Sequence, residues 1–336
     1  MIYSNIEDIK KCLADLLKIQ TWFRVNHGVS DIFSNSKFYE IIIANQLGHN
    51  PIPGHSGSRD ATDIHGNEVE YKHFKMSSSN HSWTFNDFSD STIYNMRSYL
   101  LVFAHINDVD YVYPGIMDWY YVVDGELMSH YLEAATTKIM NSRKMINVSE
   151  NQLVRLGCQK TFVDIGSSKD YAGSFQQQLK GISELSLRLE ELTGVRKILT
   201  SNKIYELLVA MKLNHEVNSE QGGRIGAHDA EDSEGNTYEY KVYKSRTWNF
   251  QDISDAVLEK YLDDKKIILA VVDKTKLEVK EIYSVNPDEA VTLLKSKLDA
   301  KISKLAREGK TIRRKQIGLS FSDISRMRSF RVLLNR

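Results

Sequence analysis

The chain contains 336 residues, of which 41% are apolar and 26% charged, and its 44 Lys and Arg are balanced by 44 Asp and Glu. This is the composition of a globular protein of about two domains, and it excludes low-complexity and collagen-like structure. Two cysteines, Cys12 and Cys158, are too few for a disulfide framework or a cysteine zinc site. We expect a cytoplasmic protein without a membrane partner, because the sequence has no apolar run of membrane-spanning length and no signal-peptide pattern at its start.

The predicted elements occur in the same order in each half of the chain, which alternates helices and strands. This alternation predicts an α/β fold in which a mixed sheet is flanked by helices. The elements are a helical lead-in (6–22; 175–192), a helix carrying Glu40 or Glu206, a β-hairpin with its turn at 64–67 or 233–236, a helix capped by Asp87 or Asp252, a buried strand (99–106; 267–272), a short strand, and a long helix (125–140; 288–308).

The two halves are copies of one another. Residues 37–48 match 203–214 at five of twelve positions, and residues 60–75 match 229–244 at nine of sixteen. The stretch from Trp83 to Asp90 matches the stretch from Trp248 to Asp255 at five of eight positions. The offsets are 166, 169 and 165 residues, close to half the chain. Such a long period indicates two tandem domains, which we place at 1–168 and 169–336.

The hairpin brings acidic residues together. If Asp63 pairs with Asn67 across the turn, Asp60 lies opposite Glu70, with Cβ atoms roughly 4.5–5.5 Å apart. Lys72 shares the face of Glu70, because residues two apart on a strand point the same way. The second half repeats the set as Asp229, Glu239 and Lys241, and the helix residues Glu40 and Glu206 add a third carboxylate to each half.

Carboxylates with free coordination positions suit Mg²⁺, with Mn²⁺ as a substitute. Asp63 and Asp232 compete with Asp60 and Asp229 for the metal, although a turn-starting Asp usually bonds the backbone. An exposed salt bridge on a polar hairpin is the plain alternative interpretation of each set. The repetition of the set in both halves favours a functional site.

Glu40, Asp60 and Glu70-x-Lys72, repeated as Glu206, Asp229 and Glu239-x-Lys241, resemble the PD-(D/E)XK nuclease superfamily, and type II restriction endonucleases in particular. The proline of that motif is replaced by Arg59 and His228. The resemblance implies two tandem restriction-endonuclease-like domains related by a pseudo-twofold axis. It also implies metal ligation by the two hairpin carboxylates of each half, helped by the carbonyl of Tyr71 or Tyr240, while the lysine positions or deprotonates the attacking water.

The resemblance implies a monomeric pseudo-dimer that cuts both strands of double-stranded DNA, with a cognate methyltransferase as a candidate partner. The alternatives are a structure-specific repair or recombination nuclease, an RNase, and a non-catalytic DNA-binding module. The recognition sequence and any requirement for a modified base are not readable from the sequence.

The candidate DNA contacts lie in two places. Residues 301–336 contain eleven Lys and Arg against two acidic residues, which leaves a net charge of +9. This region predicts a phosphate-binding surface that includes Arg313, Arg314 and Lys315, although a solvated helix face explains the charge equally well. Lys75 and Lys244 follow the hairpin lysines by three residues, and phosphate contact and solvation are equally good interpretations of them.

Overall fold

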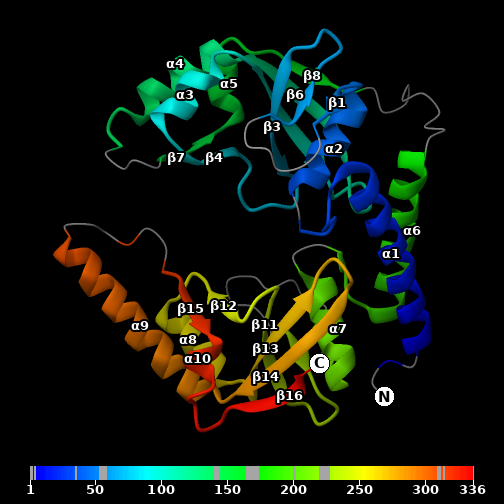
Figure 1. Cartoon of the computed structure of the whole chain (residues 1–336), viewed down its shortest axis with the longest axis vertical. Coiled ribbons are helices and arrows are strands. Elements are labelled where there is room, and N and C mark those ends of the chain that lie inside the picture. The colour runs from blue at the N-terminus through cyan, green and yellow to red at the C-terminus, as the bar shows by residue number, and fades with distance from the viewer. Residues whose placement is uncertain are drawn as a thin grey trace. The chain divides into compact units, whose positions relative to one another are not determined.

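The computed structural model describes residues 3, 5–34, 36–52, 59–139, 144–163, 174–199, 202–218, 228–308, 312 and 315–335, with only the backbone described at Asp87 (Figure 1). By internal packing the chain divides into an N-terminal unit, Ile19–Glu184, and a C-terminal unit that joins Met1–Lys18 to Leu185–Arg336. The expected boundary between residues 168 and 169 falls outside the described residues and stays a prediction.

The N-terminal unit contains a mixed six-stranded sheet with the order β1-β2-β3-β5-β6-β8. Strands β3 and β5 are parallel, and the other neighbours in this sheet are antiparallel. The elements are α1 (Ile6–His27, shared between the units), α2 (Ser36–Leu47), β1 (Asn50–Pro51), β2 (Ala61–Thr62), β3 (Glu68–Lys75), β4 (Trp83–Phe88), α3 (Asp90–Met96), β5 (Leu100–Asn107), β6 (Ile116–Asp124), α4 (Gly125–Thr136), β7 (Lys144–Val148), α5 (Glu150–Arg155) and β8 (Lys160–Phe162).

The C-terminal unit repeats this topology with a six-stranded sheet of the order β16-β14-β13-β11-β10-β9. Its parallel pair is β11 and β13. The elements are α6 (Ser174–Thr193, shared between the units), α7 (Lys203–Leu213), β9 (Glu216–Val217), β10 (Ala230–Glu231), β11 (Thr237–Tyr243), β12 (Thr247–Phe250), α8 (Asp255–Leu262), β13 (Lys266–Asp273), β14 (Glu278–Val285), α9 (Pro287–Arg307), β15 (Ile317–Ser320), α10 (Phe321–Ile324) and β16 (Arg331–Asn335).

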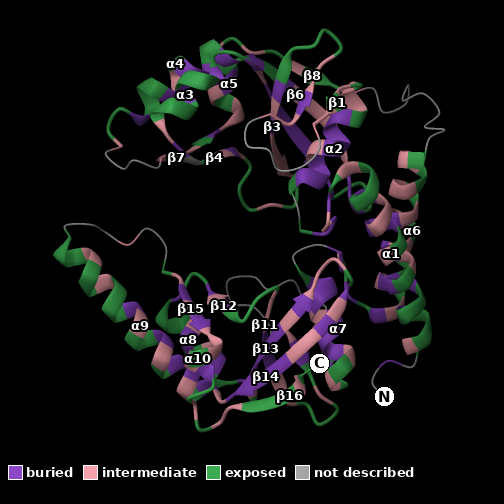
Figure 2. Ribbon diagram, in the orientation of Figure 1, coloured by how far each residue is buried: buried purple, intermediate pink, exposed green. Residues whose placement is uncertain are grey.

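The central strands are buried because they are covered on their faces. β5 and β13 are mostly buried along their length, as their near-continuous apolar runs predict (Figure 2). One face of each sheet packs against helices, α3 to α5 in the N-terminal unit and α8 to α10 in the C-terminal unit. The expected two-copy α/β architecture, with helix-flanked mixed sheets, is therefore present.

The tryptophans anchor equivalent cores. Trp83 and Trp248 are fully buried, and their indole N–H groups donate to the carbonyls of Ala104 and Ala270 at 2.9 and 3.0 Å. These hydrogen bonds pin the short strands β4 and β12 to the sheet. Both tryptophans are thus core residues, with the indole N–H paired inside the protein.

The helix caps differ from the expectation. α3 begins after Ser89 and α8 after Ser254, and each serine hydroxyl accepts a hydrogen bond from the third residue of its helix. Asp87 lies within strand β4, and Asp252 lies two residues before the cap with a φ of 53°. The prediction of Asp87 and Asp252 as caps was wrong: Asp87 belongs to strand β4, whereas Asp252 lies in the connection between the end of β12 at Phe250 and the capping residue Ser254. Among the described helices, none has the length and apolarity needed to cross a membrane.

Candidate active sites

The β-hairpin has the expected register in both units. Ala61 pairs with Val69, which sets Asp60 opposite Glu70. In the C-terminal unit Ala230 pairs with Tyr238, which sets Asp229 opposite Glu239. The turn glycines adopt the positive φ values that the turn requires, 84° and 81°.

In the N-terminal unit, the hairpin meets the start of helix α2. Oδ2 of Asp60 accepts a hydrogen bond from the backbone N–H of Tyr71 at 2.7 Å, and Oδ1 lies 3.7 Å from Nζ of Lys37. Lys37 also pairs with Glu40, with 3.0 Å between Nζ and Oε2. Lys72 donates from Nζ to Oε1 of Glu70. Lys37 therefore links Glu40 to Asp60, and the Glu70–Lys72 pair lies across the hairpin from Asp60.

The C-terminal unit reproduces this arrangement. Tyr240 donates its backbone N–H to Oδ2 of Asp229 at 2.8 Å, and Lys241 donates to Oε1 of Glu239. Lys203 lies 2.7 Å from Oε2 of Glu206 and 3.8 Å from Oδ1 of Asp229. A cavity of about 300 Å³ opens here, and its lining includes all four predicted residues: Glu206, Asp229, Glu239 and Lys241.

Lys37 and Lys203 were missed at the sequence level. They sit at the start of the helix, one turn before the glutamate, and are only 6% and 7% exposed. The signal was available, because this lysine is one of the five identical residues in the repeated 37–48 segment. It was passed over because lysine is usually a surface residue.

The carboxylates in both sites are crowded and desolvated. Burial and the neighbouring Glu40 raise the pKa of Asp60 to about 6. In the C-terminal site, burial and Asp229 raise the pKa of Glu206 to about 7, and burial also raises the pKa of Glu239. Each site therefore holds a helix carboxyl and a hairpin carboxyl that resist simultaneous ionisation. Additional positive charge would relieve this repulsion.

The lysine of the second site is held in its charged form. Burial lowers the pKa of Lys241, but the attraction of Glu239 and Tyr261 outweighs burial and raises it. Tyr261 on α8 also makes a hydrogen bond with Lys241. The Lys241 side chain is therefore held as an ammonium group, which can donate hydrogen bonds.

The competing aspartates belong to the hairpin turns. Oδ2 of Asp63 accepts a hydrogen bond from the Asn67 side-chain amide at 2.8 Å, and Oδ1 accepts the backbone N–H groups of His65 and Asn67, both at 2.8 Å. The Asn67 side chain first, and then the backbone N–H groups, hold the pKa of Asp63 below its usual range. Asp232 accepts the equivalent N–H groups and also the hydroxyl of Tyr238 at 2.6 Å. These geometries favour Asp60 and Asp229 as the site residues.

Next to each site, a tyrosine of the hairpin contacts a histidine. The hydroxyl of Tyr71 lies 2.8 Å from Nδ1 of His49, and Tyr240 makes the same 2.8 Å contact with His215. These histidines are equivalent in the two copies, so His49 and His215 each have a structural partner in the hairpin. This contact supports the strand segment at Tyr71 or Tyr240, whose backbone N–H donates a hydrogen bond to the hairpin aspartate.

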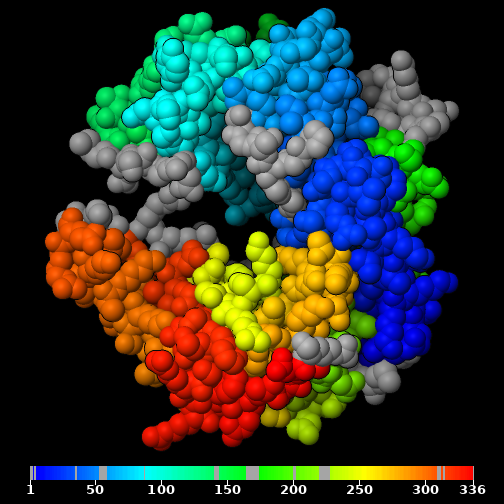
Figure 3. Space-filling model, viewed as in Figure 1, coloured from blue at the N-terminus to red at the C-terminus, as the bar shows by residue number. Residues whose placement is uncertain are grey.

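The structure describes only some of the predicted DNA contacts. Nζ of Lys75 lies 5.6 Å from the centroid of the Tyr39 ring, and Lys244 is exposed just after β11. Lys315 is exposed, whereas Arg313 and Arg314 lie outside the described residues. In the space-filling view, the C-terminal segments coloured orange to red form part of the surface of their unit (Figure 3).

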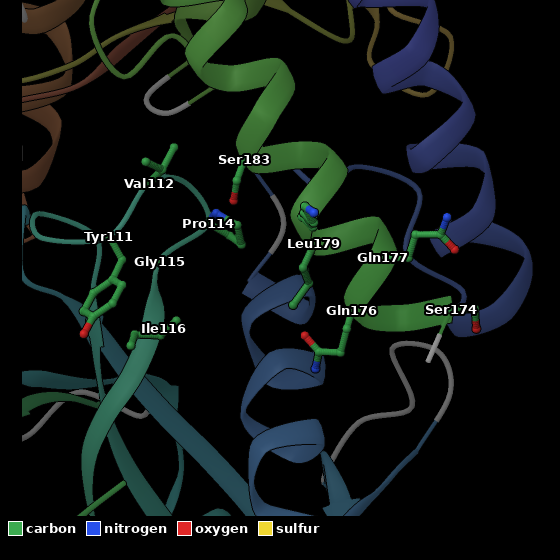
Figure 4. Close-up of a pocket in the computed structure, with 11 residues that line it drawn as sticks. Tyr111, Val112, Pro114, Gly115, Ile116, Ser174, Gln176, Gln177, Leu179 and Ser183 are labelled. Carbon is green, nitrogen blue, oxygen red and sulfur yellow. The ribbon is translucent and has the colours of Figure 1, made fainter. Parts of the chain in front are cut away.

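A larger cavity is separate from this chemistry. It has a volume of about 910 Å³ and lies in the N-terminal unit between the loop around Pro114 and the first turns of α6 (Figure 4). Its lining includes Tyr111, Leu179 and Ser183 but no carboxylate and no predicted site residue. Cavity size therefore does not identify the candidate active sites, whereas the repeated side-chain contacts do.

Comparison with known proteins yields no match, either to a protein-family model or to a curated protein. Within the described residues, no group of three or more His, Cys, Asp or Glu side chains is already arranged to hold a metal ion. The arrangement of the two sites is thus the basis for any functional conclusion.

Proposed function

We propose that the chain is a Mg²⁺-dependent DNA endonuclease with two PD-(D/E)XK-type active sites, one in each unit. The observation that carries the proposal is the repetition of one set of contacts: a buried lysine that joins a helix glutamate to a hairpin aspartate, beside a strand Glu-x-Lys pair. Both copies keep this polar cluster although they have diverged elsewhere and although burying polar groups costs free energy. A solvated hairpin needs no such burial.

The topology agrees with a restriction-endonuclease-like fold. The acidic residues lie on a hairpin whose second strand, β3 or β11, continues into a parallel pair with β5 or β13. The helix that supplies Glu40 or Glu206 contacts this strand from one face of the sheet. This agreement supports the resemblance noted in the sequence and adds the placement of the helix glutamate beside the hairpin.

The donor set fits a hard divalent cation. Asp60, Glu70 and the Tyr71 carbonyl would hold the ion in one site, and Asp229, Glu239 and the Tyr240 carbonyl in the other. All are oxygen donors, which suits Mg²⁺ or Mn²⁺, and burial together with the neighbouring Glu40 raises the pKa of Asp60. When bound, the ion would lower the pKa of a water molecule and stabilise negative charge on the phosphate.

The chain's own residues have distinct roles in this proposal. Lys72 and Lys241 orient the attacking water and the scissile phosphate through their ammonium groups. Glu40 and Glu206 keep the helix side of each site negative and hold the buried lysine in place. The basic residues outside the two clusters would contact DNA phosphates without reading bases: Lys75, Lys244, Arg313, Arg314 and Lys315.

A single chain would then address both strands of double-stranded DNA as a pseudo-dimer, in the manner of a type II restriction enzyme. A companion methyltransferase would protect the host DNA. Incubation of the purified chain with unmodified and methylated phage DNA tests this proposal, followed by sequencing of the ends. We expect discrete fragments with 5′-phosphate ends in Mg²⁺ or Mn²⁺ and no cleavage in EDTA.

Other results of this experiment would indicate a different function. Full activity in EDTA would overturn the metal assignment. Cleavage limited to junctions or flaps would indicate a repair or recombination nuclease, and cleavage limited to RNA would indicate an RNase. DNA binding without cleavage under any metal condition would leave a non-catalytic DNA-binding module.

A further inference from the structure

The two buried lysines are unusual for their position. Lys37 is the second residue of α2 and Lys203 is the first residue of α7. A cation at a helix N-terminus opposes the helix dipole, and a buried cation also loses its hydration. Both effects cost free energy, so local helix stability does not explain either lysine.

The two carboxylates that flank each lysine compensate these costs in free energy. Lys37 Nζ lies 3.0 Å from Glu40 and 3.7 Å from Asp60, and Lys203 Nζ lies 2.7 Å from Glu206 and 3.8 Å from Asp229. In both units the ammonium thus bridges the helix carboxylate and the hairpin carboxylate. A second metal ion shared by these two carboxylates would need the same place.

The charge balance of each site agrees with this position. Three carboxylates and two ammonium groups leave one net negative charge when all are ionised, and a phosphodiester adds a second. One divalent cation neutralises this total, whereas two would leave an excess of two positive charges. A low-dielectric site penalises such an excess.

We infer that Lys37 and Lys203 are built-in cations that take the place of a second metal, so that each active site binds a single divalent ion. This inference rests on the proposed nuclease function and deepens it. The lysines are positioning residues: they hold the helix carboxylate and the hairpin carboxylate together and leave the Asp and Glu of the hairpin to the metal.

Counting bound ions tests the inference without any cleavage. Free Mn²⁺ is measured by electron paramagnetic resonance after equilibrium dialysis with the full chain, and sites are counted by subtracting the binding of an Asp60→Asn, Asp229→Asn double variant. We expect one ion per site in the wild type. Lys203→Met should admit a second ion in the C-terminal site only, and Lys37→Met a second ion in the N-terminal site only.

Two variants serve as controls. Lys212→Met removes an exposed lysine from the same helix, α7, and should leave the count unchanged. Lys203→Arg keeps the positive charge and should also bind one ion per site. Thermal unfolding confirms that each variant is folded, and if Lys203→Met does not fold, Lys37→Met carries the same test in the other unit.

Several outcomes would overturn the inference: two ions per site in the wild type, no bound ion at all, or folded Lys→Met variants that still bind one. The wild-type count decides even if both Met variants fail to fold. One ion per site without DNA cleavage would support the role of the lysines and count against the nuclease. Two ions per site with normal cleavage would overturn the role of the lysines and support the nuclease.

Discussion

The two candidate active sites share one set of side-chain contacts but differ in the residues that surround it. Glu239 in the C-terminal site keeps 9% of its side chain exposed, against 21% for Glu70 in the N-terminal site. Tyr261 contacts Lys241, whereas the equivalent residue of the N-terminal unit is Met96, whose side chain has no hydroxyl to offer. The comparison separates the contacts that both sites share from those that occur in one site alone.

The residue before the hairpin aspartate also differs. Arg59 lies over the Tyr99 ring, 3.6 Å from its centroid, and pairs with Glu68. His228 instead contacts Asp264, whose side chain is fully buried, with 2.6 Å between Nδ1 and Oδ1. An arginine guanidinium supports one hairpin and a histidine ring supports the other. The two sites are therefore expected to respond differently to mutation.

The largest expected effect is the loss of cutting of one DNA strand while the other strand is still cut. Lys72→Ala should slow cutting by the N-terminal site at least 100-fold while the C-terminal site stays active, because loss of a group that orients the reacting water has effects on this scale, roughly 10²- to 10⁴-fold. Supercoiled plasmid should then accumulate as open circles. Lys241→Ala should nick the opposite strand, and Lys18→Ala, on the exposed face of α1, should linearise plasmid normally.

Two results would contradict this independence. If Lys72→Ala linearises plasmid at the normal rate, the C-terminal site alone cuts both strands. If either single variant abolishes all cutting, the two sets of residues form one composite centre.

The pH dependence of stability should also distinguish the sites. A carboxyl group with a raised folded-state pKa binds more protons folded than unfolded, so its contribution is present at low pH and is lost as pH rises. For Glu206 the loss should occur between pH 4.5 and about 7, and for Asp60 between pH 3.8 and about 6.

Urea unfolding in EDTA measures this effect. Between pH 5 and pH 8 the metal-free wild type should lose stability, and Glu206→Gln should reduce that loss by roughly 2–3 kcal/mol, since each pKa unit corresponds to about 1.4 kcal/mol. Asp60→Asn should reduce it by less. Equal pH dependence in the wild type and both variants would mean that these carboxyls titrate normally.

Charge distribution provides a third comparison. Residues 301–336 hold eleven basic and two acidic residues, whereas the corresponding residues 133–168 hold five and three. Replacing Arg313, Arg314 and Lys315 with Ala should lower the slope of log affinity against log salt by roughly 0.9 for each phosphate that these side chains neutralise in the wild type. The matched control replaces Lys10, Lys11 and Lys18, which are exposed on α1. An equal change in both triple variants would show a general effect of net charge.

The smallest expected effect concerns Tyr261. Tyr261→Phe removes its hydrogen bond with Lys241 and should slow the C-terminal site by about 3- to 10-fold, which corresponds to a hydrogen bond of roughly 1 kcal/mol. The measurement is nicking in the Lys72→Ala background, where only the C-terminal site cuts. Met96→Leu in the Lys241→Ala background is the matched control and should be silent. Equal rates for Tyr261→Phe and its parent would restrict this tyrosine to core packing.

Local patterns were enough to predict most of the fold. The lead-in helices, the hairpins and the buried strands β5 and β13 lie where apolar periodicity and the turn glycines placed them, because these elements depend on short-range geometry. The exceptions were the start of α3 and α8, where Ser89 and Ser254 are the caps, and the end of α4, which lies at Thr136, four residues before the expected end. In each half the capping serine follows the aspartate by two residues, and both residue types are common caps, so the local residue pattern does not choose between them.

The sequence by itself determined that the chain is a duplication and that each copy carries a Glu, an Asp and a Glu-x-Lys in the same order, because identity between two copies needs no structure to be seen. Only the tertiary structure decided that Lys37 and Lys203 belong with them. A lysine at a helix start looks solvated in sequence, and it becomes a buried bridge only when the hairpin aspartate, more than 20 residues away, packs against that helix turn. Desolvation and charge pairing across such a separation depend on how helix and hairpin pack, and residue spacing carries no record of that.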